Sequence, residues 1–490
     1  MKKESVMLLS ILLMCILSLV PVTASSQVTP NEYIPLSLLD YDPLVDINIT
    51  VAINAIRALD KIDITSGPDL FITLIINGAE YTSPIWNDMR YIYDCYAVTV
   101  DVPDDKKLVE VVIQLWENNG NENRLCDISS APNSNGSGLD ISLQYDISSG
   151  RWSGDNNNFG DTGYGRVCGS ADGSIYTNEY DCEVWFTISQ NDFDNDGLAY
   201  WVETNVYDTD PTINDAGQDD DTDGIPIEWE HRFGFNPSIW DDHMHLDPDG
   251  DSLNNIEEYQ TWAFGSDPFR KDIFLEIDYM QESNGDVKYV STAALELVKN
   301  PYHRRNIVFH FDTGQLDGGD IVPYDEKITF EKIRSLWNTY FLHNDTNNWR
   351  RGVFHYVLFV PDQKPGAYAF SGDVPPYWGY IPGTNGFTIA TSVIEKKAKI
   401  PLLTADHITA SLIVHEMGHN LGIRFGRSFG CDNKLTSRPW RIGWYIWRNY
   451  RSIMNYRYTY TILDYSDGSH GKKDYDDWEN IDLGYFEKPK

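Results

Sequence analysis

Basic residues are scarce in this sequence. Its 490 residues include 38 Lys and Arg against 74 Asp and Glu, so the formal net charge is −36. A nucleic-acid partner is therefore not expected, because phosphates require a basic protein surface. The chain is nevertheless no disordered acidic tail, since 41% of its residues are hydrophobic and 13% are aromatic. At roughly 150 residues per domain, the length predicts about three domains.

Long hydrophobic runs are missing after the N-terminal region. Residues 6–22 form an apolar run that follows two lysines and precedes small residues suited to cleavage after Ala24. This run has about 17 residues and is interrupted by serines and a proline, which makes it short for a membrane-spanning helix. Residues 1–24 are therefore predicted to be a signal peptide. We expect the mature chain to be secreted.

Cysteine is rare, with six residues in the chain. One lies in the predicted signal peptide, and Cys431 lies far from the other four. These four precede residue 190, and export favours two disulfide bridges among them. Three pairings are possible, of which we prefer Cys95–Cys126 with Cys168–Cys182.

The first predicted domain, residues 40–190, is an all-β sandwich. Short β-branched and aromatic runs alternate here with turns rich in Gly, Asn, Asp and Ser, a pattern that is typical of short antiparallel strands. Strands are expected at residues 47–53, 70–76, 97–102, 108–115 and 183–188. The sandwich is either a binding domain or a spacer.

Residues 55–63 and 67–72, with Thr82 and Trp86, resemble the opening of C2 domains. In that family, the aspartates that match Asp63 and Asp69 help to bind calcium. The second calcium loop of the family usually has two aspartates, whereas this chain offers one carboxylate there, that of Glu117. The resemblance implies a C2-like sandwich that contacts a cell surface or membrane in the presence of calcium.

An internal repeat occupies residues 191–268. Each of its three units places Asp at positions 1, 3 and 5 of a twelve-residue loop and Glu at position 12. Ca²⁺ takes six to eight oxygen ligands, which such a loop supplies from its carboxylates, a backbone carbonyl and a water. The predicted ligands are Asp192, Asp194, Asp196 and Glu203; Asp219, Asp221, Asp223 and Glu230; and Asp247, Asp249, Asp251 and Glu258.

The alternative for this segment is a solvated acidic linker. Residues 192–258 contain 20 acidic residues and one basic residue. Without bound cations, such crowding would oppose a compact structure, so we favour calcium loops. The repeats resemble the thrombospondin type 3 and EF-hand-like calcium repeats of extracellular proteins, which implies a connector that calcium stiffens.

Residues 270–490 show a mixed α/β pattern. Strands are predicted at 273–277, 307–311, 353–360 and 388–393, and helices at 291–299 and 331–342. A longer helix is predicted from 405 to 421, because Thr404 is a suitable N-cap and Gly422 a suitable end.

The long helix contains His415-Glu416-Met417-Gly418-His419. One helical turn separates the two histidines, so both imidazoles can bind one Zn²⁺, and Glu416 is offset toward the water that zinc would activate. The alternative is a buried histidine pair beside a surface carboxylate. The position of the pattern in the middle of a helix of an exported chain favours zinc.

The pattern continues to Gly422 and is followed by Ser-Ile-Met-Asn-Tyr at 452–456, and together these residues resemble the metzincin zinc peptidases. In that family, a Gly matching Gly422 turns the chain toward a third ligand. A Met matching Met454 forms the floor under the metal, and a Tyr matching Tyr456 stabilises the oxyanion in some branches. The resemblance implies a metzincin-like α/β catalytic domain over residues 270–490.

The third zinc ligand of this family is missing at its usual position. Six residues after His419 the chain has Phe425, which cannot bind a metal, whereas catalytic zinc normally has three protein ligands. Asp432 is the preferred substitute. The alternatives are Cys431, Asp464, Asp467 and His470.

The sequence therefore predicts a secreted zinc-dependent endopeptidase with Zn²⁺ and Ca²⁺ as cofactors and a peptide or protein as substrate. Glu416 is the expected general base, and Tyr456 the expected donor to the oxyanion. Residues 386–391 are expected to form the sheet edge on which a peptide adds as a strand. The alternative is a non-catalytic calcium-binding surface or adhesion protein with a degenerate peptidase domain.

Overall fold

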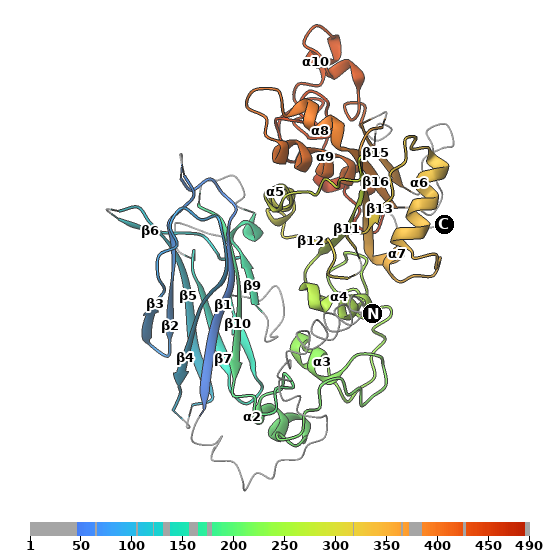
Figure 1. The fold of residues 1–490 in the computed structure, drawn as a ribbon. Helices are drawn as coiled ribbons and strands as arrows, with labels where there is room; N and C mark the ends of the chain where they lie inside the picture. Colours follow the sequence, from blue (N-terminus) through green and yellow to red (C-terminus); the bar gives the residue numbers. More distant parts are fainter. Residues whose placement is uncertain are drawn as a thin grey trace, which may run out of the picture.

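The computed structural model describes residues 47–485, except 64–65, 104–105, 121, 131–137, 156–164, 174–178, 317, 364–365, 372–384 and 425–427. The predicted signal peptide and Phe425 lie outside these residues. The chain is multidomain: a β-rich region, a segment of loops and short helices, and an α/β region follow one another (Figure 1). No helix in the described part is long and apolar enough to cross a membrane.

The N-terminal region consists of two antiparallel sheets that face each other. One sheet has the strand order β4 (Tyr91–Asp101), β1 (Asn48–Ala58), β10 (Cys182–Gln190) and β9 (Gly165–Cys168). The other has the order β3 (Ala79–Thr82), β2 (Leu70–Ile76), β5 (Leu108–Asn118), β7 (Ile141–Asp146) and β8 (Arg151–Gly154), and β6 (Asn123–Leu125) pairs with β5. The prediction of an all-β region is confirmed.

The core of this sandwich follows from the alternation along its strands. On β5, Val109, Val111, Ile113 and Leu115 are fully buried, whereas the side chains between them are more exposed. Successive side chains of a strand point to opposite faces, so these four meet the inward residues of the other sheet in one core.

The predicted disulfide pairs are wrong. None of the five described cysteines is in a disulfide, and the thiol of Cys126 contacts that of Cys182 instead of Cys95. The reason is the path of the backbone: Asp127 forms an isolated parallel bridge with Asp181, which brings their neighbours Cys126 and Cys182 together.

Each acidic loop of the connecting segment leads into a short helix. The helices are α2 (Tyr200–Val202), which continues into η4 (Glu203–Tyr207), α3 (Ile227–Phe233), and α4 (Asn255–Thr261), which continues into η5 (Trp262–Phe264). Two small cores hold the segment together: Leu198, Val202 and Ile227 in one, and Ile225, Trp229 and Phe233 in the other.

The C-terminal region contains a six-stranded sheet. Its order is β12 (Val308–Asp312), β11 (Asp272–Met280), β14 (Phe354–Val360), β16 (Asn385–Ala390) and β15 (Ala367–Ser371), and β13 (Ile321–Val322) pairs with β11. All pairs are parallel except that of β15 with β16. Every residue of β11 and β14 is buried, as expected for parallel strands covered on both faces.

Helices cover both faces of this sheet. Leu275 and Ile277 of β11 share a core with α5 (Thr292–His303) and α9 (Ala405–Asn420). On the other face, Phe274 packs in a core with α6 (Phe330–Leu336) and its extension η6 (Trp337–Phe341). The shorter helices are α7 (Arg350–Val353), α8 (Thr391–Lys397) and α10 (Ile442–Ile446), with 3₁₀ turns η3 (Gly169–Asp172), η8 (Lys434–Thr436) and η9 (Trp478–Asn480).

Two details of the predicted sheet are wrong. The strand predicted at 388–393 ends at Ala390, and α8 begins at Thr391. Residues 386–391 do not form the sheet edge, because β15 runs antiparallel along the outer side of β16. The strand at this edge of the described sheet, beyond β16, is therefore β15.

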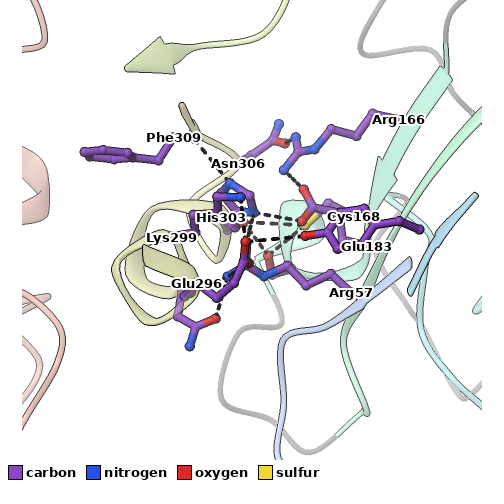
Figure 2. A network of polar contacts seen from close by, with 12 residues as sticks. Arg57, Arg166, Cys168, Glu183, Glu296, Lys299, His303, Asn306 and Phe309 are labelled. Atoms are coloured by element: carbon purple, nitrogen blue, oxygen red, sulfur yellow. Dashed lines mark hydrogen bonds and ion pairs between the residues drawn. The ribbon is translucent and has the colours of Figure 1, made fainter. Parts of the chain in front are cut away.

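The sandwich contacts the α/β region through a buried polar network (Figure 2). His303 of α5 lies with its Nδ1 2.9 Å from Glu183 Oε2 of β10, and Glu183 also forms an ion pair with Arg166 of β9. Arg166 donates to Asn306 Oδ1 at 2.5 Å. Arg57 of β1 donates to the carbonyl of Glu296 at 2.7 Å. The two regions are thus in direct contact, in addition to being connected by the repeats.

Candidate metal centre

Helix α9 carries the two histidines. It begins at the predicted residue and ends at Asn420, one residue before the predicted end. At its N-terminus, the Thr404 hydroxyl accepts a hydrogen bond from the amide of His407 at 3.1 Å. At its C-terminus, Leu421 is the cap and Gly422 has φ 91°, a left-handed conformation that favours glycine.

Both imidazoles are oriented by the backbone. Nδ1 of His415 lies 3.0 Å from the carbonyl oxygen of Ile453, and Nδ1 of His419 lies 2.7 Å from that of Ile423. A carbonyl only accepts, so each Nδ1 carries the proton. This arrangement leaves each Nε2 available, as is usual for metal-binding histidines.

Both Nε2 atoms face one carboxylate, that of Asp432. Its Oδ1 lies 3.1 Å from His415 Nε2 and its Oδ2 lies 3.0 Å from His419 Nε2. The backbone holds Asp432 in place, because its amide donates to the carbonyl of Met454 at 3.1 Å and its φ is 51°.

The charges of this group shift the pKa of each member. Burial opposes the charge of His419, but Asp432 raises the pKa of His419 to about 9. Burial likewise opposes the charge of His415, but the hydrogen bond that its ring donates to Asp432 raises the pKa of His415 above the usual value. Burial would raise the pKa of Asp432, but the two histidines hold it well below its usual range.

Glu416 and Tyr456 border the same three residues. Glu416 is buried and accepts a hydrogen bond from the amide of Ala369 in β15, and burial raises the pKa of its carboxyl against the opposing effect of the histidines. The Tyr456 ring stacks on His415 with centroids 5.9 Å apart. Its hydroxyl bonds to Asp432, and burial followed by the charge of Asp432 raises its pKa.

Met454 lies directly beneath α9. A Cβ added at Gly418 would come within 2.6 Å of Met454 Sδ and 2.9 Å of Tyr465 Cε1. Glycine at this position therefore allows the helix to approach the segment that carries Met454, which is fully buried.

The alternative third ligands lie in other environments. Cys431 is buried, and burial raises the pKa of its thiol well above the usual value, which disfavours the thiolate that binds metals. Asp464 Oδ1 accepts from the indole of Trp478 at 3.1 Å. Asp467 and His470 gather with Asp474 in a separate group.

The donor set at α9 fits zinc. One ligand atom from each of His415, His419 and Asp432 lies within 4.8 Å of the other two. Two imidazoles and one carboxylate are ligands that Zn²⁺ accepts in catalytic sites, where a fourth position remains open.

The three acidic loops share one backbone geometry. The first aspartate of each loop (Asp192, Asp219, Asp247) accepts from the amides of the fourth and sixth residues at 2.8 and 3.0 Å. Those fourth and sixth residues all have positive φ (Asn195, Gly197, Thr222, Gly224, Gly250, Ser252). The loops therefore hold their remaining carboxylates around a common centre.

Several of these carboxylate oxygens are buried without a hydrogen-bond partner. They belong to the third and twelfth positions of the loops: Asp194, Glu203, Asp221, Glu230, Asp249 and Glu258. Burial, reinforced by neighbouring carboxylates, raises the pKa of Glu203 to about 9. An uncompensated buried charge is costly, so such oxygens favour either a proton or a bound cation.

Sequence reasoning missed a further carboxylate behind each loop. The fifth aspartate of each loop accepts from the amide of a later aspartate, namely Asp215 at 3.1 Å, Asp241 at 3.1 Å and Asp272 at 2.7 Å. Their separations of 19, 18 and 21 residues are a repeated signal that the sequence contains. The hydrogen bond from Ala369 to Glu416 has no comparable signal.

No protein-family model matches the chain, and no curated protein is similar to it in sequence. Among solved structures, part of the chain is similar to a C2 domain ("Structure of a C2 domain"). The match has 8% identity and a TM-score of 0.19, and it covers 29% of this chain and 98% of that chain. It also resembles a C2 domain of plant Extended Synaptotagmin 1 (8% identity, 30% and 95%, TM-score 0.19).

A third similar structure is human GIVD cytosolic phospholipase A2, with 14% identity and a TM-score of 0.20. The match covers 30% of this chain and 17% of that chain, so it spans a small part of the phospholipase.

Proposed function

We propose that this protein is a secreted zinc-dependent endopeptidase, with its catalytic centre on α9. The observation that carries the proposal is the orientation of His415 and His419. Both direct Nε2 at the two oxygens of Asp432, while each Nδ1 donates to a backbone carbonyl. His415, His419 and Asp432 would hold the metal, beside the carboxylate of Glu416.

Zinc bound there would acidify a water molecule and polarise the substrate carbonyl. Glu416 would take the proton of the attacking water and then deliver it to the leaving amine. Burial raises the pKa of Glu416 toward neutral pH. A pKa in that direction suits a group that first accepts a proton and then donates it.

Tyr456 and β15 would position the substrate. The Tyr456 hydroxyl lies next to Asp432 and would donate to the developing oxyanion. Strand β15 pairs only with β16 among the described residues, so a peptide can add along its outer side. The amide of Ala369 in β15 bonds to Glu416, so a peptide on this strand would lie close to the general base.

Replacing the general base tests the proposal. Glu416→Gln should abolish cleavage of casein or gelatin while zinc stays near one per chain, because the substitution removes the proton acceptor and keeps the three ligands. Glu331→Gln, at an exposed position of α6, is the matched control and should cleave like the parent. Undiminished cleavage by the Glu416 variant would refute the mechanism, and a parent chain without zinc would favour the non-catalytic surface protein.

We also propose that the three loops bind Ca²⁺ and that the sandwich is C2-like, with a calcium-dependent contact to a surface or membrane. Support for the second part comes from the sequence and from one end of the sandwich. There Glu117 lies near Asp63 and Asp69, and burial followed by the charge of Asp63 raises the pKa of Glu117. Arg124 lies 3.7 Å from Glu117, which reduces the negative charge at this end.

A further inference from the structure

Four carboxylates outside the acidic repeats gather at one end of the sandwich. Asp127 follows β6, Asp172 ends η3, and Glu179 and Asp181 precede β10. One oxygen atom from each of Asp127, Asp172 and Glu179 lies within 4.8 Å of the other two. Asp181 adjoins them through its backbone bridge with Asp127.

Two of these side chains are completely buried and only partly bonded. Asp127 is 0% exposed, and Asp181 is 1% exposed. Asp127 Oδ1 accepts from the amide of Ser129 at 2.9 Å, but its Oδ2 has no hydrogen-bond partner, and neither has Oδ1 of Asp181. Oε2 of Glu179 is likewise buried without a partner. Buried carboxylate oxygens are costly unless a proton or a cation compensates them.

The backbone fixes the positions of these carboxylates. The carbonyl of Asp127 accepts from the amide of Cys182 at 2.8 Å. Gly169 lies so close that a Cβ at this position would come within 2.4 Å of the Asp127 carbonyl oxygen. Packed backbone segments thus hold Asp127 next to η3 and to the start of β10.

The charge of the group is poorly balanced. Arg304 forms an ion pair with Asp60 at 3.0 Å. It lowers the pKa of Asp181 less than burial and the neighbouring carboxylates raise it. Burial, together with the neighbouring carboxylates, raises the pKa of Asp127 to about 8 and that of Asp181 to about 7. A divalent cation would replace these protons.

We propose that Asp127, Asp172, Glu179 and Asp181 form a calcium site of the sandwich, separate from the three repeat loops. The donors are all carboxylate oxygens, which suit Ca²⁺ better than Zn²⁺. The site also differs from the Asp63, Asp69 and Glu117 group. Its four residues lie just after β6, at the end of η3 and just before β10. They are next to the contact with α5, where the Ser170 hydroxyl lies 3.5 Å from the carbonyl oxygen of His303.

The number of bound calcium ions tests this site. Equilibrium dialysis of the full chain with ⁴⁵Ca²⁺ should give one ion fewer per chain for Asp127→Asn/Glu179→Gln than for the parent. Glu110→Gln, an exposed position on β5 of the same sandwich, should bind as many ions as the parent. Equal stoichiometry in the double variant, with an unchanged circular dichroism spectrum, would overturn the proposal.

A milder variant covers the case in which the double variant does not fold. Glu179 is partly exposed, so Glu179→Gln should fold and should weaken one calcium site by at least roughly tenfold. Calcium binding identical to that of the parent would overturn the proposal, as would a site that takes zinc and not calcium.

Discussion

Asp432 contacts both histidines although it lies thirteen residues after His419 in the sequence. The helix fixes the relative positions of His415, Glu416 and His419, so local spacing predicts that they share a site. Asp432 reaches them because the chain turns back at a positive φ and bonds to the Met454 carbonyl. Sequence alone could therefore name Asp432 only as one of several alternatives.

Replacing this carboxylate tests whether it is the third ligand. Asp432→Asn should weaken zinc binding by at least ~10–100-fold, because the amide brings no negative charge and binds zinc poorly. Competition with a chromophoric chelator measures the affinity. Asp467→Asn is the control, since Asp467 belongs to the separate group with His470 and Asp474; equal losses in both variants would contradict the assignment.

The raised pKa of His419 predicts that the stability of the zinc-free chain depends on pH. Its pKa is about 9 in the folded chain and about 6.5 in an unfolded one. The proton is therefore bound more tightly in the folded state. The stability that this adds is fully present below pH 6.5 and is lost as the pH rises through 9.

Thermal unfolding with a zinc-selective chelator, in the presence of calcium, measures this effect. The difference in melting temperature between the parent and His419→Gln should shrink as the pH is raised from 6.5 to 9.5. Other buried carboxyls titrate in the same range, so the comparison with the variant separates the effect of His419 and its partner Asp432 from that of the other groups. A difference that stays constant with pH would contradict the prediction.

At the level of helices, strands and loops, the sequence predicts most of the structure where a pattern is local. The strand expected at 70–76 is β2, and the predicted long helix is α9. Strand β15 is not predicted, because its five residues, Ala-Tyr-Ala-Phe-Ser, have neither strict alternation nor a long apolar run. Its position depends on pairing with β16, which is a tertiary interaction.

The acidic loops predict that calcium stabilises residues 191–268. Chelating calcium should lower the melting temperature and open this segment to proteolysis, because the buried carboxylates of the loops would then repel one another. At a free calcium concentration one hundred times the Kd of a loop, binding to that loop adds about 2.7 kcal/mol to the free energy of unfolding.

A single loop provides the matched comparison. Glu230→Gln removes the twelfth-position carboxylate of the second loop and should require more calcium to reach the melting temperature of the parent. Glu228→Gln on the same helix is the control, because Glu228 Oε2 bonds to the amide of Gly217 and lies outside the predicted ligand set. A melting temperature that does not respond to calcium would contradict the interpretation of the repeats.

For the whole molecule, the sequence predicts three successive regions but not their arrangement. Arg57, Glu183 and His303 are far apart in the sequence, and nothing in their neighbourhoods distinguishes them from other charged residues. They meet only after the sandwich and α5 have folded, so their contact depends on two tertiary structures. The same limit explains the contact between Cys126 and Cys182, which follows from the bridge between Asp127 and Asp181.

The network at His303 gives the molecule a mechanical property. The sandwich is attached to the α/β region twice: covalently through the repeats, and non-covalently where Arg57 and Glu183 meet α5 (Figures 1 and 2). The three parts therefore form a closed ring, and the position of the sandwich depends on two connections: the repeats and the contact with α5. If the loops bind calcium as proposed, its removal would loosen the connection through the repeats, while the contact at His303 would still hold the sandwich against α5.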